Sequence, residues 1–178
     1  MCRDLEKLLL RRNWQKKLNA VVLNSDAIRI SMWGSVEKIK EDRTSPETRE
    51  LNNQLTFGAM DYATNQILRI GISVIYDSNA NKQHNRLEKY AIATKNQVLA
   101  VTVRIKVPRK VALERTQARN SLPDQRQLSA QQATDTIDRL TNEIEEPSKE
   151  ELIVEIDGRW TFDKQYEVFN QKLQSINS

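Results

Sequence analysis

The chain contains few of the residues that build disulfides, metal centres and tight turns. Its 178 residues include one cysteine, Cys2, and one histidine, His84. A single cysteine excludes an internal disulfide and a cysteine-built metal site, and a single histidine leaves little material for a Ser-His-Asp triad. We therefore assign no metal ligands. The 4 glycines and 4 prolines also argue against a many-stranded sandwich and against low-complexity disorder.

Long hydrophobic runs are missing as well. No segment approaches the ~20 apolar residues that a membrane span needs. The apolar stretch at residues 8–10 is too short for a secretory signal and is followed by Arg11 and Arg12. We expect a cytoplasmic protein with no membrane partner, folded as one domain over residues 1–178. The net charge of +4 is compatible with ordinary solubility and with an anionic ligand such as a nucleotide or an RNA end.

Short β-branched runs alternate with helical patterns along the chain. We expect strands at 20–23, 72–76, 98–107 and 152–156. We expect helices at 4–18, 26–33, about 55–70, 82–95, 109–119, 135–146 and from 162 to the C-terminus. Two polar loops are expected, an exposed excursion at 35–50 and a mobile lid at 120–135. This alternation predicts a three-layer α/β domain with a mostly parallel sheet.

Two apolar patterns indicate which faces of these elements are covered. In the helix that Gly71 ends, six apolar residues fall on one face: Leu55, Ala59, Tyr62, Ala63, Ile67 and Ile70. In the strand that Pro108 ends, four alternate residues share a face that is expected to be partly covered: Leu99, Val101, Val103 and Ile105.

The first chemical motif follows the first expected strand. Asn24, Ser25 and Asp26 come directly after the short apolar run 20–23, and Arg29 follows one helical turn later. An aspartate at a strand end can accept the proton of an attacking hydroxyl, and the arginine can hold a phosphate beside it. The other interpretation is a plain helix N-cap with a surface arginine. All three residues before Ala27 are favourable cap types, and we expect Asp26 to be the cap.

The second motif repeats this layout after the next strand. The run that ends at Tyr76 leads into Asp77, then Asn79, with Arg86 farther along. In open α/β sheets, ligands bind beyond the carboxyl ends of the strands, so Asp77 is placed to orient a substrate hydroxyl or a magnesium-bound water. Alternatively, Asp77 and Asn79 only satisfy a tight turn.

The third motif is a pair of arginines at the root of the expected lid. Arg115 and Arg119 are four residues apart, so they share one helix face, where like charges repel unless an anion lies between them. On a closing loop they would neutralise charge on a transferring phosphoryl group. A solvated basic face is the other interpretation.

In this order and at these spacings, the three motifs resemble those of the P-loop kinases in the polynucleotide kinase and zeta-toxin group, over about residues 15–160. The resemblance implies a P-loop NTPase-like domain that transfers phosphate from ATP, with Mg2+, to a hydroxyl acceptor such as an RNA or DNA 5′ end or a small molecule. It implies a general base at Asp26 and a phosphate contact at Arg29. Asp77 completes the catalytic set, Ser25, Asn79 and Arg86 line the acceptor side, and Arg115 and Arg119 contact ATP from the lid.

The sequence departs from this family at its start. No glycine precedes Gly34, so the glycine-rich phosphate loop (Walker A) and the first strand that leads into it are absent. We expect a truncated or degenerate family member, or an N-terminus altered by a start-site or frameshift artefact. Enzyme activity is therefore open, and impaired if present.

Two further readings of function stay open. One is a non-catalytic α/β module that binds nucleic acid or a partner protein, supported by six basic residues: Arg104, Lys106, Arg109, Lys110, Arg115 and Arg119. The other is a remnant with no function of its own. The sequence does not indicate an oligomeric state.

Overall fold

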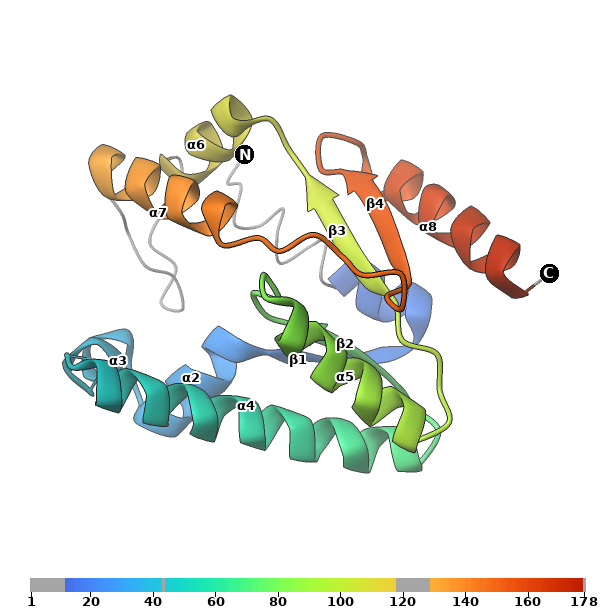
Figure 1. The fold of residues 1–178 in the computed structure, drawn as a ribbon, viewed down its shortest axis with the longest axis horizontal. Coiled ribbons are helices and arrows are strands. Elements are labelled where there is room, and N and C mark those ends of the chain that lie inside the picture. Colours follow the sequence, from blue (N-terminus) through green and yellow to red (C-terminus); the bar gives the residue numbers. More distant parts are fainter. Residues whose placement is uncertain (1–11, 43, 118–128, 178) are drawn as a thin grey trace.

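The computed structural model describes residues 12–42, 44–117 and 129–177 (Figure 1). Residues 12–18 form a helical segment at the start of this part. The elements that follow are β1 (Ala20–Asn24), α2 (Ser25–Trp33), α3 (Val36–Asp42), α4 (Pro46–Arg69), β2 (Ser73–Asp77), α5 (Gln83–Lys95), β3 (Thr102–Lys106), α6 (Arg109–Gln117), α7 (Ala130–Asn142), β4 (Ile153–Asp157) and α8 (Phe162–Asn177).

The described strands form two parallel pairs and no larger sheet. β1 pairs with β2 in a register that runs from Ala20 opposite Ser73 to Asn24 opposite Asp77. β3 pairs with β4, with Thr102 opposite Ile153. The α/β class with parallel strands is confirmed, and the expected sheet takes the form of two separate two-stranded ladders.

Helices cover these pairs from several sides. In Figure 1, α2, α3 and α4 accompany the β1–β2 pair, α8 lies along β4, and α6 and α7 lie side by side at the upper left. Val154, Ile156 and Phe169 form a small buried core between β4 and α8. Trp14 packs against this core from the helical segment at 12–18, with its ring 5.0 Å from that of Phe169.

The prediction that the apolar line of α4 is its covered face is wrong. Leu55, Tyr62 and Ile70 are exposed by 49%, 69% and 71%. The buried side of α4 is instead a line of residues four apart, most of them polar: Asn52, Thr56, Met60 and Thr64. Threonine side chains are short, and Thr56 satisfies its hydroxyl by donating to its own helix. The apolar spacing therefore identified the helix, while contact with α2 and β2 decided which line of it is covered.

Several boundaries also differ from expectation. The excursion at 35–50 contains α3 and the first turn of α4, where Ser45 and Thr48 form a capping box. Residues 130–135, expected in the lid, are the first turns of α7, which Ser129 caps. The rest of the predicted lid, at 120–128, lies outside the described residues. Among the described helices, none has the length and apolar character to cross a membrane.

Candidate functional site

The carboxyl ends of β1 and β2 are joined by a side-chain hydrogen bond. Asn24 and Asp77 are opposite each other in the register, and Asn24 Nδ2 donates to Asp77 Oδ2 over 2.8 Å. Asn24 Oδ1 accepts from the backbone N–H of Ala27 at 2.9 Å, so Asn24, and not Asp26, is the cap of α2. Asp26 lies two residues beyond Asn24 and therefore belongs to the same edge as Asp77.

Asp26 and Arg29 form an ion pair in the first turns of α2. Arg29 Nη1 lies 3.2 Å from Asp26 Oδ1. The two side chains differ in exposure, at 71% for Asp26 and 10% for Arg29. Arg29 Nη2 donates to Asn53 Oδ1 over 3.2 Å, and the guanidinium lies 5.4 Å from the ring centre of Phe57. Two residues of α4 therefore fix the plane of the guanidinium beneath an exposed carboxylate.

The other two small polar residues of the predicted site differ in accessibility. Ser25 is buried at the first position of α2, whereas Asn79 is exposed in the loop that follows β2. Both lie beyond the same strand ends, so the structure brings the two distant motifs to one edge. The roles assigned to these residues remain predictions.

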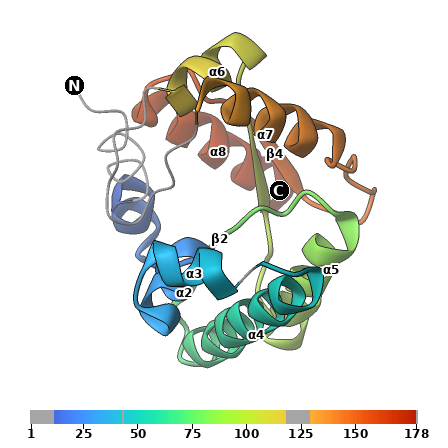
Figure 2. The same ribbon diagram turned by 90° about the vertical axis from the view of Figure 1, so that its left-hand side faces the viewer.

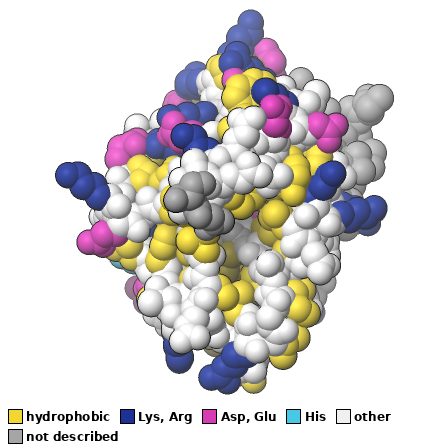
Figure 3. Space-filling view, turned by 90° about the vertical axis from the view of Figure 1, so that its right-hand side faces the viewer, with side chains coloured by type: hydrophobic (Ala, Val, Ile, Leu, Met, Phe, Trp, Pro, Cys, Tyr) yellow, Lys and Arg dark blue, Asp and Glu magenta, His cyan; other side chains and the backbone are white. Residues whose placement is uncertain are grey.

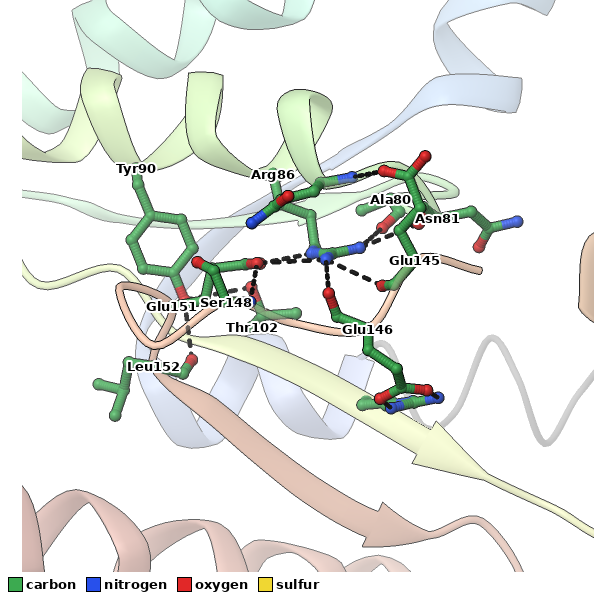
Figure 4. A network of polar contacts seen from close by, with 12 residues as sticks. Ala80, Asn81, Arg86, Tyr90, Thr102, Glu145, Glu146, Ser148, Glu151 and Leu152 are labelled. Carbon is green, nitrogen blue, oxygen red and sulfur yellow. Dashed lines mark hydrogen bonds and ion pairs between the residues drawn. The ribbon is translucent and has the colours of Figure 1, made fainter. Parts of the chain in front are cut away.

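Arg86 is the centre of a buried polar network (Figure 4). It forms an ion pair with Glu151, and both side chains are buried. Its Nη1 donates to the carbonyls of Ala80 and Asn81 at 2.9 and 3.0 Å, and its Nη2 donates to the carbonyl of Glu145 at 3.0 Å. Arg86 thus ties the loop after β2 to the segment that leads into β4.

These contacts use every nitrogen of the Arg86 guanidinium on protein acceptors. The hydrogen bonds from Arg86, helped by the backbone N–H of Ser148, hold the pKa of the Glu151 carboxyl below its usual range. In this arrangement Arg86 positions the Ala80–Asn81 loop, and its predicted contact with substrate would require it to leave these partners.

One of the two predicted lid arginines is described. Arg115, on α6, donates from Nη2 to the carbonyl of Gly158 at 2.9 Å, just beyond β4. The neighbouring Asp157 has its pKa lowered to about 2, mainly by hydrogen bonds from Arg159, with a smaller contribution from the charge of Arg115. Arg119 lies outside the described residues. β4 therefore ends on an aspartate, Asp157, as β2 does, and Arg115 contacts the residue that follows it.

Sequence reasoning missed the residues that hold this site in place. Asn24 was visible only as a favourable cap type, and its bond to Asp77 depends on the strand register. Asn53 and Glu151 carry no local signal because their partners are 24 and 65 residues away. Asp157 did carry one, since it ends a β-branched strand as Asp77 does.

The geometry agrees with what a family comparison finds. The family described as an AAA domain, one of the P-loop NTPase-like kinase groups, matches residues 7–144. The chain belongs to this AAA domain family. No curated protein and no solved structure matched the chain. The protein is therefore a P-loop NTPase-like domain of the nucleotide-binding, kinase-like type.

Domains of this kind typically use a nucleotide and Mg2+, and the described residues of this AAA domain do not fit that pair. Within the described ranges, no group of three or more acidic, histidine or cysteine side chains comes together to hold a metal ion. Asp26 is paired with Arg29, and Asp77 accepts from Asn24. The only described side chain of the predicted ATP contacts is Arg115, which is bound to a backbone carbonyl.

Proposed function

We propose that this AAA domain supplies the acceptor side of a phosphotransferase site of the polynucleotide kinase-like and zeta-toxin-like kind. The observation that carries the proposal is the bond between Asn24 and Asp77, because it brings two motifs 53 residues apart to one edge. Asp26 would be the general base and Asp77 would orient the acceptor hydroxyl. Ser25 and Asn79 would line the acceptor side.

The proposed chemistry depends on the contrast between Asp26 and Arg29. The Asp26 carboxylate is exposed, so an incoming hydroxyl can reach it and transfer a proton to it. Arg29 is held from below by Asn53 and Phe57, so its planar guanidinium is oriented before any ligand arrives. Its Nε is buried, so the terminal N–H groups that Asp26 and Asn53 leave unused would contact an acceptor phosphate beside Asp26, as at a polynucleotide 5′ end.

The donor side of the reaction is the part that the described residues do not supply. Arg115 would contact a nucleotide only after leaving the carbonyl of Gly158, and Arg119 keeps the nucleotide contact that the family resemblance implies. Arg86 would act as a positioning residue behind the acceptor loop. With no glycine-rich loop in the sequence to hold donor phosphates, we expect little or no ATP-dependent phosphotransfer by this chain.

The pairing of the basic residues disfavours the alternative of a non-catalytic nucleic-acid module. Three of the six basic residues that supported it form ion pairs: Arg104 with Glu146, Lys106 with Glu155, and Arg109 with Asp138. A cation already neutralised by a carboxylate releases fewer counterions when it meets a phosphate, so the salt dependence of binding would be shallow. An acceptor site with one phosphate contact remains the better account.

An acceptor-binding measurement tests the proposal. A short oligonucleotide with a 5′-hydroxyl end, labelled at its 3′ end, is titrated with the protein and followed by fluorescence anisotropy. We expect Arg29→Lys to weaken binding about tenfold or more, because the guanidinium fork to a charged group is lost. Asp26→Asn should bind as the parent does, since its role is proton transfer.

Controls distinguish binding at this site from non-specific attraction between basic residues and the oligonucleotide. Arg109→Gln removes an exposed arginine elsewhere and should leave binding unchanged. Equal binding by Arg29→Lys and the parent would overturn the acceptor role of Arg29. Displacement of the oligonucleotide by a nucleoside at similar concentration would identify a small-molecule acceptor instead. Robust phosphotransfer from ATP by the chain alone would contradict our account of the donor side.

A further inference from the structure

Helix α4 carries a line of exposed apolar residues. Leu51, Leu55 and Tyr62 each expose about half of their surface or more, and Gly58 and Ala59 between them are also exposed. The steps from 51 to 55, 58 and 62 are four, three and four residues, so these positions lie along one side of the helix. In Figures 1 and 2, α4 lies at the lower edge of the molecule. The line is therefore open to a partner.

Exposed apolar side chains elsewhere are not arranged in this way. Figure 3 shows some of them around a hollow on the side of the molecule that lies at the right of Figure 1. Ile72, Val98 and Leu99 are exposed and precede β2 and β3 in loops, outside any helix or strand. Single exposed apolar residues are common on soluble proteins, whereas a continuous group is typical of an interaction site. The line on α4 is such a group, because one helix of 24 residues carries all of it.

Gly58 has no evident role within its own chain. Glycine is among the least favourable residues in a helix interior, and it is useful where the backbone needs a positive φ or where another group approaches closely. Gly58 lies in the middle of α4 with helical backbone. A Cβ added there would meet no atom of the described residues within 4 Å. The close approach that Gly58 permits is therefore directed toward a partner outside the chain.

The two ends of the line carry opposite charges. Glu47 lies one turn before Leu51, and Arg69 lies two turns after Tyr62. Both are exposed, and neither forms an ion pair with another described residue. A second α4 helix in the antiparallel direction would place Glu47 of each copy near Arg69 of the other. A parallel helix would place like charges together, which is unfavourable.

We propose that this line binds the same line of a second copy of the chain, with the two α4 helices antiparallel about a two-fold axis. In the register that sets Leu55 of one copy over Gly58 of the other, Leu51 faces Tyr62, and each contact occurs twice. The large side chain of Leu55 then meets the residue that has none, so the helices can approach closely. One pair of helices buries less than a standard interface, so we expect a dissociation constant in the micromolar range.

The proposed dimer leaves the candidate site open. Asn53 and Phe57, which hold Arg29, each lie two residues from Leu55, about 200° around the helix. The candidate site is therefore on the opposite side of α4 from the proposed interface. The inference does not depend on the proposed function, and loss of acceptor binding alone would affect only that function.

Sedimentation velocity of the full chain tests the dimer over about 1–200 µM, a range that spans the expected dissociation constant. Gly58→Leu places a side chain where the helices should meet, so the dissociation constant should rise about tenfold or more. The same variant meets nothing in its own chain, so its stability to urea, measured where the chain is monomeric, should not fall. Leu55→Lys should also weaken the dimer. The control Leu99→Lys, at a similarly exposed residue outside α4, should not.

Two further measurements test the antiparallel direction. Glu47→Lys should weaken the dimer several-fold, and adding Arg69→Glu should restore it, because the charges are exchanged but remain complementary. With Cys2 replaced by Ser, a mixture of Leu51→Cys and Tyr62→Cys chains should oxidise to a disulfide-linked dimer, because these positions face each other across the interface. Neither cysteine variant alone should do so.

Three results would contradict the proposal. A parent chain that is monomeric throughout the concentration range would overturn it. So would a dimer that Gly58→Leu leaves unchanged, because its interface would then lie elsewhere. Disulfide formation by either cysteine variant alone would exclude the antiparallel arrangement.

Discussion

The buried ion pair of Arg86 and Glu151 should contribute most to the stability of the contact between the loop after β2 and the segment that leads into β4. Removing one partner of a buried ion pair costs about 3–5 kcal/mol, because the other charge is left without compensation. In Glu151→Ala, Arg86 keeps four backbone carbonyls as acceptors, so we expect a loss near the lower end, about 3 kcal/mol. Arg86→Ala also takes a donor from each of these carbonyls; the Asn81 carbonyl still accepts from Glu145 N, and the loss at the others costs about 1 kcal/mol or more each.

We therefore expect Arg86→Ala to be the more destabilising of the two. Native domains are stable by only about 5–15 kcal/mol, so this change should remove a third or more of the total. Urea unfolding followed by tryptophan fluorescence measures the free energy of unfolding. The control pair, Arg139 and Glu143, forms an exposed i,i+4 ion pair on α7, and its alanine variants should cost about 0.5 kcal/mol or less. A loss below about 1 kcal/mol for Glu151→Ala would refute the reasoning.

The same pair predicts a dependence on pH. Arg86 lowers the pKa of Glu151 in the folded state, so the stabilisation is complete above the unfolded-state pKa of about 4.3 and is lost as the pH falls through the folded-state value. The difference in unfolding free energy between the parent and Glu151→Ala should therefore be constant near neutral pH and narrow below about pH 4. A difference that stays the same at pH 3 would contradict this assignment.

Three further predictions concern the strand ends and two glycines. Gly158→Ala would place its Cβ within 3 Å of the Ile105 and Val107 side chains and should lower the free energy of unfolding, measured with urea, by about 1–3 kcal/mol. Gly58→Ala, in an open part of α4, should raise it by up to about 1 kcal/mol. Asn24→Ala removes the α2 cap and the hydrogen bond to Asp77, so it should lower the free energy of unfolding by about 1 kcal/mol or more. An unchanged midpoint of urea unfolding would show that these two hydrogen bonds do not stabilise the fold. Asp157 should titrate with a pKa of about 2 by NMR, and Arg159→Gln should raise this pKa toward about 3.9. An unchanged pKa in Arg159→Gln would show that Arg159 does not cause the shift.

The strands and the acidic strand ends were predictable because they are local. A short apolar run followed by a carboxylate identified both Asp26, two residues beyond β1, and Asp77, the last residue of β2, and parallel pairing then brought them to one edge. The residues that fix this edge were not predictable, because Asn53 and Glu151 act across the fold and no local pattern marks them. The cap position failed for a related reason. Three adjacent residues are good caps, and the strand register, not cap preference, selected Asn24.

The partial cover expected along 98–107 is found at Val101, which packs against the buried core, and is missing at Leu99, Val103 and Ile105, which are exposed. Alternation in the sequence predicts a strand with one face covered, and Val103 and Ile105 have the residue types for it. Their neighbours Val154 and Ile156, which α8 and Trp14 reach, are buried, so the pattern is correct wherever the ladder has cover. The alternation therefore predicts the strand and the residue types along it, whereas the cover of each residue depends on which distant elements reach it. The core of α8 and Trp14 forms on Val154 and Ile156 of β4, and the facing Val103 and Ile105 of β3 stay exposed.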